Sequence, residues 1–127
     1  MSLLLASSAY AKDTKPVYLN QKKIESGGHV LVEADKSVSK MKIGSVYVTI
    51  TDDCNCSLES FNASMPKHKH GMYVKPSVPK LLSSDKKGRT YKIDGVKLHM
   101  PGLWLLDLKI KKNSKEIDIK VPYEMNL

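Results

Sequence analysis

The sequence predicts an all-β fold, an immunoglobulin-like antiparallel β-sandwich of about seven strands. From about Val30 onward, apolar residues recur at every second position, which is the period of a strand with one buried face. Turn-forming residues separate these runs at short intervals, and no long segment carries a helical stripe. With 127 residues the chain has room for one domain with one core.

Each expected strand alternates apolar and polar side chains. In chain order, the expected strands are His29–Ala34, Val46–Thr51, Ser60–Met65, Tyr91–Ile93, Val96–Met100, Leu106–Lys111 and Glu116–Val121. Asp94-Gly95 is a strong tight-turn signal and predicts a hairpin between the fourth and fifth of these strands. Further turns are expected at Gly27-Gly28, Asp52-Asp53, Asp85–Gly88 and Asn113-Ser114.

The first residues are expected to be the end of an export signal. Ala9-Tyr10-Ala11 has the small-x-small form of a signal-peptidase site, and the short apolar run from Leu3 to Ala6 precedes it. We therefore assign residues 1–15 to a signal-peptide remnant and a disordered N-terminus, and residues 16–127 to the sandwich. This predicts a periplasmic or secreted protein with no transmembrane span. The alternative is a frayed N-terminus that matches a cleavage site by chance.

The net charge of +8 raises the question of an acidic partner. Twenty of the 21 basic residues are Lys, Arg89 is the single Arg, and aromatic residues make up 6% of the chain. Nucleic-acid binding relies on Arg for bidentate contacts and on aromatic rings for stacking. We therefore expect no nucleic-acid partner, and we expect most of the lysines to solvate a polar face.

The strongest chemical signal is Met65-Pro66-Lys67-His68-Lys69-His70-Gly71-Met72. In an extended segment residues i and i+2 point the same way, so the two histidines are expected to project together. Pro66 and Gly71 bracket the pair and predict a bend. Imidazole suits copper, zinc and nickel, and thioether sulfur narrows the preference toward Cu(I).

A second cluster, Leu98–Trp104, offers another histidine and another methionine. The candidate metal ligands are therefore His68, His70, Met65, Met72, His99 and Met100. The alternative is that the methionines fill the core and the histidines serve the backbone. Lys67 and Lys69 place positive charge beside any bound cation, which favours that alternative.

Cys54 and Cys56 have no other intramolecular partner. In an exported protein an even cysteine count suggests a disulfide, and a bridge at this spacing requires a tight turn. The Asp and Asn residues around the pair supply turn chemistry. A disulfide or idle thiols are favoured over a Cys-x-Cys thiolate pair for a soft metal.

Together these motifs resemble the YtkA-like domain family. The resemblance rests on Met65-Pro66-x-His68-x-His70-Gly71-Met72, Lys75-Pro76, Gly88-x-x-Tyr91 and Gly95-Val96-x-Leu98-His99-Met100-Pro101-Gly102-x-Trp104. It covers roughly residues 30–121. It implies a β-sandwich on an exported or membrane-anchored protein, similar in architecture to FixH-like proteins and to immunoglobulin-like copper carriers of the periplasm. It implies no established catalytic activity.

Two functions follow as expectations. The first is an exported, non-catalytic module that binds or handles copper through the His/Met cluster. The second is an envelope structural or protein-interaction domain with no metal, marked by an exposed strand edge or apolar patch. An enzyme has the least support, because no nucleophile elbow, phosphate loop or carboxylate pair is present. We therefore predict no catalytic residue.

Overall fold

The computed structural model describes residues 15–25, 27–51 and 54–126. The expected signal-peptide site and the expected turn at Asp52-Asp53 lie outside these residues. Within the described ranges the chain forms nine strands and one four-residue helix: β1 (Val17–Lys23), β2 (His29–Ala34), α2 (Lys36–Ser39), β3 (Gly44–Thr51), β4 (Cys56–Met65), β5 (His70–Gly71), β6 (Lys80–Asp85), β7 (Gly88–Val96), β8 (Gly102–Lys112) and β9 (Lys115–Met125).

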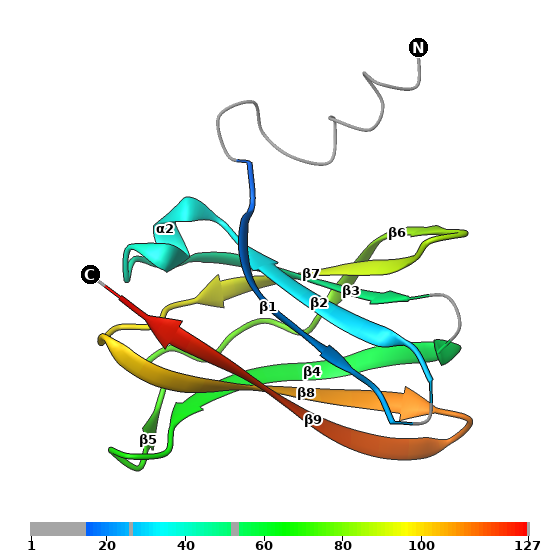
Figure 1. The fold of residues 1–127 in the computed structure, drawn as a ribbon. Coiled ribbons are helices and arrows are strands. Elements are labelled where there is room, and N and C mark those ends of the chain that lie inside the picture. The colour runs from blue at the N-terminus through cyan, green and yellow to red at the C-terminus, as the bar shows by residue number, and fades with distance from the viewer. Residues whose placement is uncertain (1–14, 26, 52–53, 127) are drawn as a thin grey trace.

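The strands form two antiparallel sheets, which confirms the predicted β-sandwich (Figure 1). One sheet has the order β1-β2-β3-β7-β6, and the other has the order β5-β4-β8-β9. Seven of these strands follow the immunoglobulin order, with β2-β3-β7-β6 facing β4-β8-β9. The described chain therefore has nine strands, two more than expected, because β1 and β5 add an edge strand to each sheet.

Three strands lack the pattern that sequence analysis relies on. In β1 the only fully buried side chain is Leu19, β5 is two residues long, and all six residues of β6 are exposed. Alternation of apolar and polar residues arises only where one face of a strand is covered. The sequences of these three strands at or near the sheet edges therefore lack the alternation that predicts a strand.

The expected hairpin at Asp94-Gly95 is wrong. Strand β7 runs through both residues, and its register against β3 shifts between the pairs Val46–Ile93 and Gly44–Val96. Gly95 has a φ of +74°, which suits a β-bulge as well as a turn. The carboxylate of Asp94 accepts a hydrogen bond from the Ser45 hydroxyl at 2.6 Å and holds the bulge against β3.

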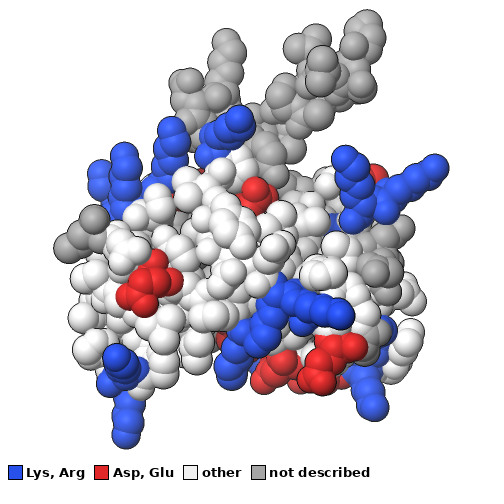
Figure 2. Space-filling model, in the orientation of Figure 1, with Lys and Arg blue, Asp and Glu red and all other residues white. Residues whose placement is uncertain are grey.

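The core lies between the sheets and is built from the inward rows of the long strands. Along β8 the fully buried residues alternate with half-buried ones, from Trp104 to Ile110. The outward row of β8 pairs with β9 through ion pairs of Lys109 with Asp118 (3.3 Å) and of Asp107 with Lys120 (3.4 Å). On the face in Figure 2 the basic side chains stand in separate groups with acidic ones among them.

The sandwich has two distinct ends. Strands β4, β7 and β9 run toward the end that carries β5 and the loop after β7, at the left of Figure 1. The β8–β9 hairpin and the start of β4 lie at the opposite end. The hairpin turn at Asn113-Ser114 is as predicted, with φ values of 50° and 69°. Among the described residues no helix is long and apolar enough to cross a membrane.

Candidate metal centre

The first His/Met cluster forms the turn between β4 and β5. Met65 pairs with His70 across this hairpin, and the backbone N–H of His68 donates to the Met65 carbonyl at 3.2 Å. Lys69 has a φ of 53°, so the segment is a bend, as Pro66 and Gly71 predicted. The two histidines therefore do not lie on one extended strand, yet their ring centroids are 5.9 Å apart.

The second cluster is the loop that crosses from β7 to β8. Its shape is fixed by the Trp104 indole, whose Nε1–H donates to the Met100 carbonyl at 2.9 Å. Gly102 has a φ of +122°, and a Cβ there would lie 3.0 Å from Met65 Cε. The absence of a side chain at Gly102 thus lets this loop approach the end of β4.

The structure brings the two clusters together around His99. The His99 ring centroid lies 5.4 Å from that of His70, and the two rings are stacked. The ring of Trp104 meets the ring of His99 edge-on, also with a centroid distance of 5.4 Å. Residues about thirty positions apart in sequence therefore place His68, His70 and His99 in one row at this end of the sandwich.

His99 is the least satisfied polar side chain of the row. Both of its ring nitrogens are buried and have no hydrogen-bond partner among the described residues. Burial lowers the pKa of the His99 imidazole below its usual range, and the positive charges of His70 and Lys97 lower it further. A neutral imidazole with unpaired nitrogens is the form that binds a metal ion.

The methionines differ in their access to this row. Met65 is 1% exposed and belongs to the core, whereas Met72 and Met100 are partly buried and pack against the core. Among the described residues, no group of three or more His, Cys, Asp or Glu side chains is arranged to hold a metal ion. Of the three candidate thioethers, Met72 and Met100 are less buried than Met65.

Tyr73 is part of this site and was not found by sequence analysis. Its ring stacks on His99 with a centroid distance of 3.9 Å, the shortest ring contact of the cluster, although 79% of the residue is exposed. An aromatic residue that immediately follows the His/Met motif was the available signal. The position of Tyr73 over His99 depends on the path of the chain after β5. The spacing of apolar residues in the sequence does not predict that path.

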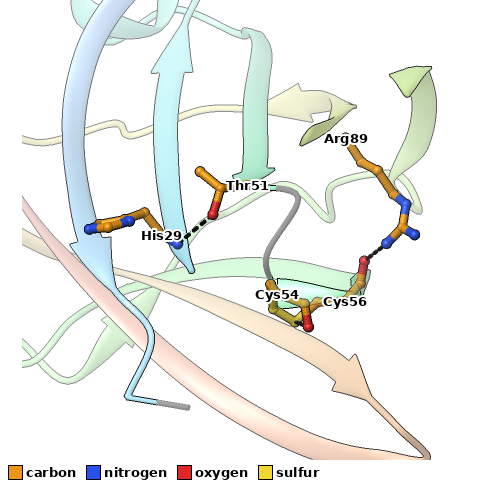
Figure 3. The surroundings of a disulfide bond; sticks show 5 residues. All are labelled: His29, Thr51, Cys54, Cys56 and Arg89. Atoms are coloured by element: carbon orange, nitrogen blue, oxygen red, sulfur yellow. Dashed lines mark hydrogen bonds between the residues drawn. A yellow bond between two sulfur atoms is a disulfide. The ribbon is translucent and has the colours of Figure 1, made fainter. Parts of the chain in front are cut away.

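The cysteines lie at the opposite end of the sandwich, where they form a disulfide (Figure 3). Their Cα atoms are 5.1 Å apart, and Asn55 between them has a φ of 53°. The expected tight turn is therefore present. Arg89 from β7 donates a hydrogen bond to the Cys56 carbonyl, and the Thr51 hydroxyl accepts one from the His29 backbone at 2.8 Å.

No family model, curated protein or solved structure matches the chain. The resemblance to YtkA-like domains therefore rests on the sequence motifs alone and stays a prediction.

Proposed function

We propose that this protein is an exported, non-catalytic module that binds copper at the end of the sandwich formed by the β4–β5 turn and the β7–β8 loop. The observation that carries the proposal is His99, whose two buried ring nitrogens lack hydrogen-bond partners among the described residues, while the His70 ring stacks 5.4 Å away. A buried polar group without a partner costs roughly 1–3 kcal/mol. A metal ion would satisfy one of these nitrogens.

The chemistry of the available donors favours Cu(I). Imidazole serves several metals, but thioether sulfur selects a soft ion, and both Met72 and Met100 lie against this end of the core. Zinc sites are usually completed by thiolates, carboxylates or a third imidazole, and no such set of three is arranged here among the described residues. Lys67 and Lys69 are exposed, so solvent screens their repulsion of a bound cation.

The expected export signal and the motif resemblance favour the same function from the sequence side. A periplasmic or secreted location agrees with a disulfide between Cys54 and Cys56. The motif resemblance to YtkA-like domains points to non-catalytic copper-related proteins of the envelope. Both arguments are independent of the geometry around His99.

The test is a calorimetric titration of the untagged chain with Cu(I) under anaerobic, reducing conditions and with Cu(II) in air. We expect saturable one-to-one binding, weakened at least about 100-fold by His68→Ala with His70→Ala, which corresponds to about 2.7 kcal/mol. His29→Ala is the matched control, because His29 is exposed and lies beside Thr51 at the other end. Equal affinities in the double variant and the control would contradict the proposal.

The alternative function, an envelope structural or interaction domain without metal, predicts no saturable binding in the same titration. In that case the unpaired nitrogens of His99 would be bridged by water or would bind a protein group.

A further inference from the structure

Strand β6 presents an unpaired edge and two exposed leucines. It is the last strand of its sheet and pairs only with β7 among the described residues. Leu81 and Leu82 are 51% and 41% exposed, and Val78 just before them is 79% exposed. Figure 1 shows β6 at the margin of the fold, away from β8 and β9. An edge of this kind is a template for another strand.

The opposite side of the sandwich is protected. The Asn20 side chain of β1 donates to the Pro122 carbonyl of β9 at 2.6 Å, and the Lys22 ammonium donates to the Lys120 carbonyl at 2.9 Å. Pro122 itself removes a backbone donor from β9. Side chains and a proline thus cover that edge, whereas no comparable contact covers β6 among the described residues.

We propose that β6 pairs antiparallel with β6 of a second copy of this chain. A two-fold axis between Leu82 and Ser83 sets three pairs in each half of the interface: Lys80 with Asp85, Leu81 with Ser84, and Leu82 with Ser83. The strand is therefore self-complementary, because its one cation faces its one anion on both sides of the axis. Pro79 and the turn after Asp85 limit the pairing to these six residues.

Two local features favour this register. Within the chain, Lys80 lies directly opposite Lys92, whose ammonium pairs with Asp94 at 3.7 Å, so Asp85 of the second copy would give Lys80 a carboxylate partner of its own. The β6 register shifts between Leu81 and Ser83, where a bulge interrupts the strand. Because the two-fold axis passes beside this bulge, the bulge of one copy lies next to the bulge of the other. A second copy thus fits the edge better than a regular strand of another protein. The inference does not depend on copper.

Sedimentation equilibrium of the whole chain tests the pairing, over roughly 1 µM to 1 mM. We expect a reversible monomer–dimer equilibrium that Lys80→Glu weakens about tenfold, because two cross-strand pairs turn from attractive to repulsive. Adding Asp85→Lys to that variant should restore most of the affinity. Lys36→Glu on exposed α2 is the matched control and should leave the dimer unchanged.

Asp85 also accepts a hydrogen bond from the Lys87 backbone at 2.8 Å, so the restored variant has a weakened turn. Hydrogen exchange of the unaltered chain gives a measurement that needs no variant: protection of the β6 amides should rise with protein concentration. A chain that stays monomeric, a dimer equally sensitive to Lys80→Glu and Lys36→Glu, or concentration-independent exchange of β6 would overturn the proposal.

Discussion

The two ends of the sandwich are organised in opposite ways. At one end the Cys54–Cys56 disulfide ties the start of β4, and Arg89 closes onto the Cys56 carbonyl. At the other end three histidines form a row, and the buried ring nitrogens of His99 have no partner among the described residues. One end is fixed by covalent and hydrogen bonds, and the other has unused hydrogen-bonding capacity among the described residues.

This difference predicts that stability and the proposed copper binding depend on opposite ends of the sandwich. Polar groups left unpaired in a buried place cost free energy, and such groups persist mainly where a ligand uses them. Substitutions at the disulfide end should therefore mainly lower the free energy of unfolding. Substitutions at the histidine end should mainly weaken copper binding.

The largest effect is expected from inserting the same methyl group at each end. Gly88 and Gly102 both have positive φ values, of 142° and 122°. A Cβ at Gly88 would lie 2.2 Å from the Ile50 carbonyl oxygen, which is backbone, whereas at Gly102 it would meet the flexible end of Met65 at 3.0 Å. We expect Gly88→Ala to cost about 4 kcal/mol and Gly102→Ala about 2 kcal/mol, measured by urea unfolding. The reverse order would contradict this difference between the two ends.

A smaller effect is expected from removing the disulfide. Because the bridge closes a very short loop, Cys54→Ala with Cys56→Ala should lower the free energy of unfolding by about 1–2 kcal/mol. Copper affinity, measured by the same calorimetry, should not change. A loss of copper affinity would instead assign the metal to the two thiols.

The smallest effect concerns pH. Since the folded-state pKa of His99 lies below its unfolded value, the unfolded chain binds more protons as pH falls. Stability should therefore be complete above about pH 6.5 and should decline below it. His99→Phe keeps an aromatic ring and removes the titration, so its unfolding free energy should depend less on pH between 7 and 5. His29→Phe is the control; if it flattened the profile equally, His99 would not be the cause.

Sequence analysis found the strands whose faces are covered and missed those at the margins. Strands β2, β8 and β9 alternate between buried and more exposed residues because the opposite sheet covers one face of each. Strand β6 has six exposed residues, so burial imposed no pattern on it. At Asp94-Gly95 the same positive-φ glycine serves a turn or a bulge, and only the pairing with β3 distinguishes the two.

The site was predictable as a set of residues but not as an arrangement. The motifs singled out His68, His70 and His99, and local geometry predicted the bend at Pro66. The stacking of Tyr73 on His99 and the approach of Gly102 to Met65 arise from packing between distant segments. Such contacts leave no periodic trace in a single sequence.

The most direct test of the central claim is the response of the histidine side chains to Cu(I), followed by the ¹⁵N resonances of the imidazole rings. We predict that the signals of His70 and His99 shift together and saturate at one equivalent, while those of His29 stay unchanged. If His99 stays unshifted, or if all four histidines shift gradually and without saturation, the histidine end is not a metal site.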